Sequence, residues 1–200
     1  MQIDNFAHKS KSWDMSSKRV KNAESIAKGI LKNIKTRADM TLMDFGAGTG
    51  LLSYFIAPSV EKIVAVDNSP SMLEMFREKQ NEFDCHTELI QADLSTQNID
   101  HKFDGIISSM TIHHVEDTQD LLQKFYDLLN KNGTIGLADL ETEDGSFHTD
   151  DTGVFHFGFD KAEFLNIAKK VGFKDLKIET ISVSSKPHGE YPIFLLTGRK

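Results

Sequence analysis

Glycines and acidic residues stand at the ends of successive predicted strands, where they could bind a nucleotide-like ligand. The first strand leads into Asp44-Phe45-Gly46-Ala47-Gly48-Thr49-Gly50, in which the glycines allow a tight turn and a close approach to a ligand where a helix begins. Asp67 closes the next apolar run and could accept hydrogen bonds from both hydroxyls of a ribose. Asp93 closes the third run.

Each of these features also has a purely structural interpretation. A glycine-rich turn can exist without a ligand, Asp67 or Asn68 could cap the helix expected from Ser69, and Asp93 could cap a turn. For one acid alone, capping would be the better explanation. Because three acids stand at three strand ends, we predict a shared binding site.

Histidines follow the fourth predicted strand and recur in a later segment. His113 and His114 stand on the side where the ligand would lie, and a histidine, which titrates near neutrality, can take a proton from a hydroxyl group. They could equally cap or pack the helix that begins near Asp117. His148 and His156 fall in a segment expected to cover the pocket, where an ordinary loop role is the alternative.

The elements that must position these residues alternate between short apolar strands and amphipathic helices. Strands that are apolar throughout are typical of a parallel sheet covered by helices on both faces, so we predict an α/β doubly wound fold. Strands are expected at 41–45, 62–66, 87–90, 103–107 and 133–138. Helices are expected at 18–34, 69–82 and 117–129.

The last third departs from this alternation. A helix is expected at 160–172, followed by strands at 176–183 and 193–197. Consecutive strands joined only by a loop usually pair antiparallel. The sheet is therefore predicted to end in a hairpin with a long connection through Lys186-Pro187-His188-Gly189.

Composition narrows the function classes. The 200 residues are 39% hydrophobic and 26% charged, which is typical of one soluble globular domain. Cys85 is the only cysteine, so no disulfide can form within the chain, and we expect a reduced, cytoplasmic protein. No stretch is apolar enough for membrane insertion. The net charge of -7 would repel a phosphate backbone, so nucleic acid is not expected as a partner.

With these motifs in order, the chain from about Thr41 to Lys200 resembles class I S-adenosylmethionine-dependent methyltransferases. Within that family it is most similar to the small-molecule branch of ubiquinone and menaquinone biosynthesis methyltransferases, on the run Ser108-Ser109-Met110-Thr111-Ile112-His113-His114-Val115. The motifs that carry the resemblance are residues 44–50, Val64-Ala65-Val66-Asp67, Ser69-Pro70-Ser71-Met72-Leu73, Gln91-Ala92-Asp93-Leu94, Phe103-Asp104-Gly105-Ile106-Ile107-Ser108-Ser109 and Leu128-Leu129-Asn130-Lys131-Asn132-Gly133-Thr134.

The resemblance implies S-adenosyl-L-methionine as the cofactor and a three-layer Rossmann-like sheet of order 3-2-1-4-5-7-6 with the seventh strand antiparallel. The glycine loop would face the methionine part, Asp67 the ribose, Asp93 with Leu94 the adenine, and Ser109 the reacting sulfonium. The cofactor-binding residues implied are Asp44, Gly46, Ala47, Gly48, Gly50, Asp67, Asn68, Met72, Asp93, Leu94 and Ser109.

The resemblance also divides the single domain, residues 1–200, into parts. Residues 1–36 would form a lid segment and a helix, 37–140 the cofactor-binding core, and 141–200 a substrate-side insert and the terminal hairpin. Substrate residues would be Phe6, Trp13, Met110 and His156, and catalytic residues His113 and His114. Further aromatic residues near the methyl group would be Phe155, Phe157 and Phe159, which favours a small, partly apolar acceptor. The charges of Lys18 and Arg19 could meet the cofactor's carboxylate.

Two alternative functions remain: a nicotinamide-dependent oxidoreductase, and a non-catalytic or protein-methylating member of the same fold. A nicotinamide-dependent oxidoreductase would carry Gly-x-Gly-x-x-Gly, whereas Gly50 comes one residue early. A non-catalytic or a protein-methylating member of the same fold would carry the same cofactor motifs, so the motifs alone do not separate it from a small-molecule enzyme. The fourth strand ends in Ser108-Ser109-Met110, without the carboxylate that catechol-type enzymes use for magnesium, and we treat Asp139 and the acids after it as solvated surface. We expect no metal.

Overall fold

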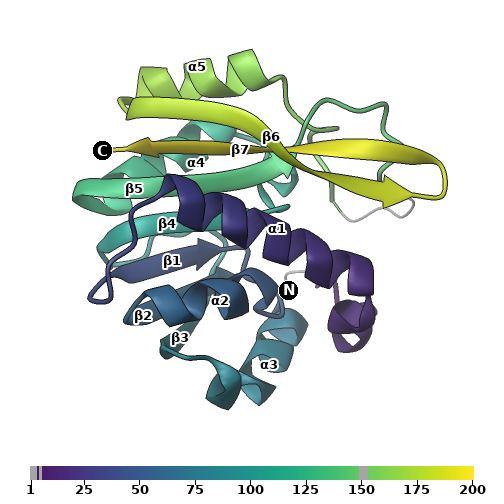
Figure 1. The fold of residues 1–200 in the computed structure, drawn as a ribbon, viewed down its shortest axis with the longest axis horizontal. Helices are drawn as coiled ribbons and strands as arrows, with labels where there is room; N and C mark the ends of the chain where they lie inside the picture. Colours follow the sequence, from purple (N-terminus) through teal and green to yellow (C-terminus); the bar gives the residue numbers. More distant parts are fainter. Residues whose placement is uncertain (1–3, 5, 149–152) are drawn as a thin grey trace.

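The computed structural model describes residues 4, 6–148 and 153–200, and its frame is one seven-stranded sheet (Figure 1). The strand order is β3-β2-β1-β4-β5-β7-β6, and β7 runs antiparallel to both β5 and β6 while the other pairs are parallel. The predicted order and the antiparallel last strand are confirmed. The strands are β1 (Thr41–Phe45), β2 (Lys62–Asp67), β3 (His86–Gln91), β4 (Phe103–Ser109), β5 (Leu129–Leu140), β6 (Lys174–Lys186) and β7 (Gly189–Arg199).

Helices cover both faces of the sheet and so make the three predicted layers (Figure 1). The α-helices are α1 (Ser17–Asn33), α2 (Leu51–Ile56), α3 (Pro70–Glu78), α4 (Thr118–Leu128) and α5 (Lys161–Val171). Short 3-10 turns form at Ser10–Met15, Ala57–Ser59, Gln80–Glu82 and Ile112–His114. None of the helices in the described ranges is long and apolar enough to cross a membrane.

Alternate residues of the central strands face two separate cores. Leu42 and Ile63 pack with residues of α1, α2 and α3, whereas their chain neighbours Met43 and Val64 pack with residues of α4 and α5. Because both faces of these strands are buried, nearly every residue in them is apolar. This double burial fixes the carboxyl ends of β1, β2 and β4 side by side at one edge.

Polar side chains begin the helices at that edge. The Oγ of Ser69 accepts a hydrogen bond from the Met72 N–H and caps α3, and the Oδ1 of Asp117 accepts one from the Asp120 N–H and caps α4. The α-helix expected at 69–82 is shorter than predicted, because α3 ends at Glu78 and the next turn is 3-10.

The terminal hairpin is confirmed, but its predicted long connection is wrong. β6 reaches Lys186 and β7 begins at Gly189, so only two residues turn between them. The outer part of β6 is largely exposed, and its polar residues gave the sequence no apolar signal. The hairpin tip is held instead by the insert, since Lys186 Nζ donates to Phe147 O and His188 Nε2 lies 2.7 Å from Ser146 O.

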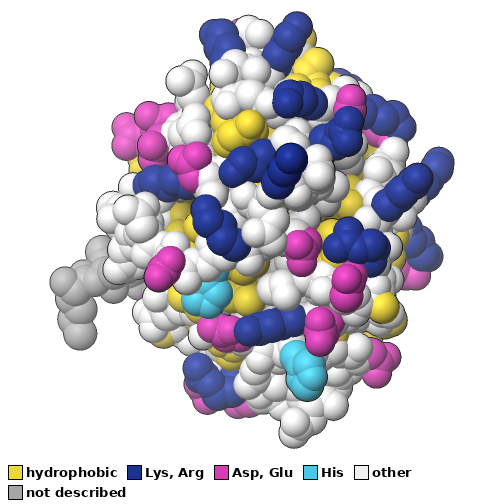
Figure 2. All heavy atoms as spheres, turned by 90° about the vertical axis from the view of Figure 1, so that its left-hand side faces the viewer, with side chains coloured by type: hydrophobic (Ala, Val, Ile, Leu, Met, Phe, Trp, Pro, Cys, Tyr) yellow, Lys and Arg dark blue, Asp and Glu magenta, His cyan; other side chains and the backbone are white. Residues whose placement is uncertain are grey.

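The face at the amino ends of the parallel strands carries mixed charge. Figure 2 shows Lys and Arg side chains interspersed with Asp and Glu across this view. Such a face creates no single-sign potential of the kind that attracts a nucleic-acid backbone.

Candidate functional site

The loop after β1 crosses the carboxyl edge of the sheet on three glycines with positive φ. The φ angles are +68° at Gly46, +54° at Gly48 and +88° at Gly50, a region that residues with a Cβ rarely adopt. The N–H groups of Gly46 and Ala47 donate to Val66 O at 2.8 and 3.3 Å, which ties the loop to β2.

The three glycines have different surroundings. A Cβ at Gly46 would lie 2.1 Å from Thr111, and one at Gly50 would lie 2.7 Å from Phe76. A Cβ at Gly48 would meet nothing within 4 Å. Gly46 and Gly50 are therefore required by packing, whereas Gly48 faces open space in which a ligand could approach the backbone.

Asp67 connects this loop to the start of α3. One carboxylate oxygen accepts a hydrogen bond from the Gly48 N–H at 2.8 Å, and the other accepts one from the Ser69 N–H at 2.8 Å. The N-cap itself is Ser69, so neither Asp67 nor Asn68 is the cap. Burial raises the pKa of Asp67 despite these hydrogen bonds. A carboxylate oxygen can accept two hydrogen bonds, so Asp67 retains acceptor capacity for ligand hydroxyls.

Asp44 lies deeper than its place in the motif suggested. Its side chain is 1% exposed, and Oδ2 accepts a hydrogen bond from Ser53 Oγ at 2.6 Å. Burial raises its pKa to about 7; the Ser53 hydrogen bond opposes this rise and the charge of Asp67 adds to it. Asp44 therefore joins the end of β1 to α2 beneath the loop.

The residues after β3 and β4 reach the same edge. Asp93 Oδ1 accepts hydrogen bonds from the Ser95 N–H at 2.9 Å and the Ser95 hydroxyl at 2.6 Å, so the turn-capping alternative is present. Leu94 and Met72 are buried. Ser109 ends β4, and Met110 follows with φ of +58°, an uncommon conformation for a residue with a side chain.

The segment before α1 folds back onto this edge. Asp4 accepts hydrogen bonds from Ser69 Oγ at 2.7 Å and from the Ser71 N–H at 3.1 Å, at the start of α3. Asp14 accepts one from Thr49 Oγ1 at 2.5 Å, within the glycine loop, and pairs with Lys79. Two carboxylates thus fasten the described part of this segment over the predicted site.

Aromatic and basic side chains link the segment to the histidines and the hairpin. The Phe6 ring meets the rings of His114 and Trp13 edge-on, with centroids 5.5 and 6.1 Å apart. Arg19 lies over the Trp13 ring at 4.1 Å, and Lys18 Nζ donates to Ser185 O. Both cations therefore have partners, Arg19 in the segment before α1 and Lys18 in the hairpin.

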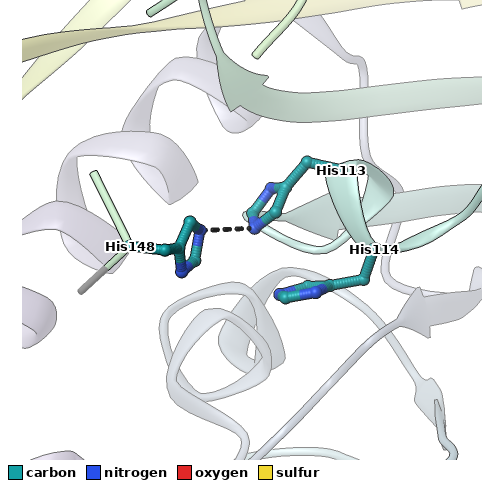
Figure 3. A group of neighbouring side chains, drawn as sticks. All are labelled: His113, His114 and His148. Carbon is teal, nitrogen blue, oxygen red and sulfur yellow. Dashed lines mark hydrogen bonds between the residues drawn. The ribbon is translucent and has the colours of Figure 1, made fainter. Parts of the chain in front are cut away.

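Three histidines from two parts of the chain converge beside Phe6 (Figure 3). His113, 1% exposed, places Nδ1 2.6 Å from Asp139 Oδ1 and Nε2 3.1 Å from His148 Nε2. His114 Nδ1 lies 3.2 Å from Gly153 O. The strand β5 supplies Asp139, and the insert supplies His148.

Burial keeps two of the three imidazoles, those of His114 and His148, neutral near pH 7. Burial, together with the neighbouring rings, lowers the pKa of His114 to about 4 and that of His148 to about 3. Burial alone would raise the pKa of Asp139, but the charge of His113 and hydrogen bonds from the His113 ring and the Leu140 N–H lower it overall. Asp139 is therefore an ionised carboxylate inside the protein.

Sequence reasoning missed Asp139 and undervalued His148. Asp139 belongs to a buried strand and is fully buried, so its assignment to solvated surface is wrong. Its position within an apolar run was a signal that could have identified it. His156 does not join the cluster as drawn in Figure 3, since its Nε2 lies 3.0 Å from Val115 O.

The aromatic residues expected around the methyl group separate in the structure. Phe155 and Phe157 are each 57% exposed, and Phe159 packs against Phe164 and Phe194 in the core. Phe6 contacts His114 of the cluster, and Trp13 contacts Phe6. Of these aromatic residues, Phe6 and Trp13 therefore lie nearest the histidines, and Phe159 belongs to the core.

Comparison with known sequences identifies relatives. A family model described as a methyltransferase domain matches residues 42–133. An uncharacterized methyltransferase of Schizosaccharomyces pombe is 30% identical over 165 residues, which cover 74% of this chain and 58% of that protein. The chain thus spans little more than half the length of that relative.

Comparison with solved structures identifies the same fold. A methyltransferase in complex with the Haloferax volcanii Trm112 methyltransferase activator has a TM-score of 0.76 at 16% identity, with 98% of this chain and 96% of that chain covered. Haemonchus contortus phosphoethanolamine N-methyltransferase 2 in complex with S-adenosyl-L-methionine has a TM-score of 0.72 at 15% identity, covering 100% of this chain and 60% of that one. At these identities the likeness shows the fold alone.

The different surroundings of the glycines predict different effects of alanine. Gly50→Ala should lower the free energy of unfolding by about 1–3 kcal/mol more than Gly48→Ala, since both incur the positive-φ penalty but only the first overlaps Phe76. Chemical denaturation of the two variants measures this difference. Equal losses would contradict the packing role of Gly50.

The raised pKa of Asp44 predicts a pH-dependent stability. The folded protein holds a proton that the unfolded chain releases above the ordinary value of 3.8, so this contribution to stability is complete below about pH 4 and is lost as the pH rises through about 7. Asp44→Asn lacks this titration. Calorimetry at about pH 5 and pH 8 should therefore show wild type losing stability relative to the variant. A constant difference would contradict the raised pKa.

Proposed function

The chain belongs to the class I S-adenosylmethionine-dependent methyltransferases, and we propose that it transfers the cofactor's methyl group to a small, partly apolar acceptor. The observation that carries the proposal is the contact between Gly48 and Asp67. Gly48 offers open space beside the backbone, and Asp67 holds that backbone while keeping acceptor capacity. The finer likeness to ubiquinone and menaquinone biosynthesis methyltransferases remains a prediction.

We propose that the cofactor lies along the carboxyl ends of β1, β2 and β3. The methionine part would lie against the glycine loop and Ala47, the ribose hydroxyls at Asp67 and Asn68, and the adenine at Asp93 and Leu94. Met72 would support the adenosine from α3, and Ser109 would stand beside the sulfonium. The common edge reached by these strands supports this placement.

The acceptor would bind between the segment before α1 and the histidine cluster. Phe6 and Trp13 supply apolar surface there, Met110 stands beside Ser109, and His156 holds the insert in place through Val115 O. We propose that residues 1–36 form the lid and a helix, 37–140 the cofactor-binding core, and 141–200 the insert and the hairpin. The single thiol supports a reducing, cytoplasmic location.

Cations near the cluster suit an acceptor that also carries an acidic group. Burial lowers the pKa of Lys186, and the charges of Arg19 and Lys9 lower it further. The charge of Lys186 in turn contributes to the lowered pKa of His148. These three basic side chains, offset in part by Asp14 near Arg19 and Glu143 near Lys186, make this region less negative than the net charge of -7 for the whole chain indicates. An acidic, partly apolar metabolite fits it better than a nucleic acid, whose backbone the whole chain repels.

The reaction requires little from the protein beyond position. With the cofactor bound, the acceptor atom would attack the methyl carbon as the carbon–sulfur bond breaks, and the electron pair of that bond would stay on sulfur to leave neutral S-adenosylhomocysteine. Holding the two reactants in line contributes about 7–11 kcal/mol. For a hydroxyl acceptor, His113 has the partner that a base needs, because Asp139 orients its ring, while His114 lines the same space.

The cofactor assignment predicts selective binding. Calorimetry should show binding of S-adenosylmethionine and S-adenosylhomocysteine and none of NAD. Asp67→Ala should weaken that binding by about 1–3 kcal/mol, and Gly48→Val should abolish it, because its side chain would fill the open space. Asp39→Ala, which removes an exposed acid elsewhere, is the control. Binding of NAD alone would assign the chain to the oxidoreductases.

The acceptor assignment predicts a rate effect at His113. Pools of metabolites, peptides and RNA are first screened for methyl transfer, and transfer to RNA or intact protein alone would refute a small acceptor. With the acceptor found, His113→Ala should lower the single-turnover rate about 10²–10⁴-fold while cofactor affinity stays near wild type. His101→Ala serves as the matched control, since His101 pairs with Glu88 away from the cluster. An unchanged rate would leave His113 a structural residue.

A further inference from the structure

We propose that His113, His114 and His148 bind a divalent transition-metal ion through their Nε2 atoms, with Zn²⁺ as the best fit. One ring nitrogen from each of the three residues lies within 4.8 Å of the other two. Figure 3 shows the rings turned toward a common space, with His113 and His114 contributed by the turn after β4 and His148 by the insert. All three ligands would be imidazole nitrogens, whereas the expectation of no metal considered only carboxylate ligands.

The second nitrogen of two of these rings is already engaged. His113 Nδ1 donates to the ionised Asp139, and His114 Nδ1 lies at hydrogen-bond distance from the carbonyl of Gly153, which can only accept. A neutral imidazole that donates from Nδ1 has its lone pair on Nε2. Metal-bound histidines usually have this arrangement, with a carboxylate or a backbone carbonyl holding the distal N–H.

Distances between the nitrogens suit a tetrahedral ion. Zn–N bonds of about 2.0–2.1 Å place two ligand nitrogens roughly 3.4 Å apart. The Nε2 atoms of His113 and His148 are 3.1 Å apart, close to this spacing, and a ring nitrogen of His114 lies within 4.8 Å of both residues, so an ion would need the rings to turn and draw closer. Between these two nitrogens His148 is the donor, because His113 keeps its hydrogen on Nδ1. A bound ion would require His148 to carry its hydrogen on Nδ1 instead.

Charge and donor type select the kind of metal. Asp139 supplies one buried negative charge behind His113, which offsets part of the charge of a divalent ion. Imidazole ligands suit Zn²⁺ and its neighbours in the transition series, whereas Mg²⁺ prefers oxygen ligands. The proposal departs from the expectation of no metal, which rested on the missing carboxylate at the end of β4 and did not consider imidazole ligands.

The architecture brings the third ligand into place from a distance. His148 follows the insert residues Ser146 and Phe147, and the hairpin tip contacts both through His188 and Lys186. His113 and His114 follow Thr111, whose side chain packs against Gly46 in the glycine loop. The proposed ion would thus lie between the cofactor loop and the insert.

What the ion would do rests on the proposed function. Three protein ligands leave a fourth position open, as in catalytic zinc sites. An acceptor hydroxyl bound there would lose its proton to solvent, and its oxygen would attack the sulfonium methyl group while the carbon–sulfur electron pair stays on sulfur. The metal would then replace His113 as the group that stabilises the deprotonated acceptor.

Metal binding is tested on the full chain without a polyhistidine tag and after treatment with a chelator. Titration with Zn²⁺ in a calorimeter should show one ion per chain, and Co²⁺ should give the strong visible absorption of a four-coordinate site. Asp139→Asn should weaken Zn²⁺ binding about 10–100-fold, the usual effect of losing an outer-shell partner. His148→Gln and His114→Gln should weaken it more.

His101→Gln is the matched control, since it removes a histidine outside the cluster and should bind Zn²⁺ as wild type does. Circular dichroism checks that each variant folds. If only one of His114→Gln and His148→Gln folds, its Zn²⁺ affinity alone tests the proposal. Absence of stoichiometric binding to wild type, or wild-type affinity in a folded cluster variant, overturns the proposal. Zn²⁺ binding without S-adenosylmethionine binding would contradict the proposed function and leave the metal site standing. S-adenosylmethionine binding without Zn²⁺ binding would overturn the metal site and leave the proposed function standing.

Discussion

Buried carboxylates at the carboxyl edge of the sheet must find hydrogen-bond donors, and the rest of the site depends on this constraint. An ionised carboxylate inside a protein is costly unless it is hydrogen-bonded. Asp44 is satisfied by Ser53 of α2, and Asp67 by the backbone of Gly48 and of Ser69. Asp139 accepts hydrogen bonds from the His113 ring and from the Leu140 N–H. Each acid thereby ties the end of one strand to a different functional segment.

The same constraint explains why the two halves of the site differ. On the proposed cofactor side, backbone N–H groups of Gly48 and Ser69 satisfy Asp67, so the loop shape depends on its glycines. On the proposed acceptor side, a side chain satisfies Asp139, so the orientation of His113 depends on one particular pair. The first arrangement suits a cofactor common to a whole family. The second suits chemistry specific to this chain.

The sequence predicted what local pattern determines. The positions of the strands, the helix that begins near Asp117 and the glycine loop follow from apolar runs and helix starts, and the structure agrees. The strand order was implied by the family resemblance, and the structure confirms it. Contacts between residues distant in the chain could not be predicted. The pair of His113 and Asp139 spans 26 positions, and the place of His148 depends on contacts made by the tip of the hairpin, which lies beyond the predicted strand residues 176–183 and 193–197.

The two carboxylates that fasten the segment before α1 also have a consequence for how a cofactor arrives and leaves. Asp4 binds the start of α3 and Asp14 binds Thr49 of the glycine loop, on either side of the backbone that a cofactor would approach. A cofactor bound at Gly48 would therefore lie beside a segment that these two bonds hold in place. Each is an ordinary charge-assisted hydrogen bond, with a net contribution of about 1.5–3 kcal/mol. If the segment covers the bound cofactor, having to break these bonds would slow its arrival and its departure alike, so the segment would set the residence time while the loop would set the affinity.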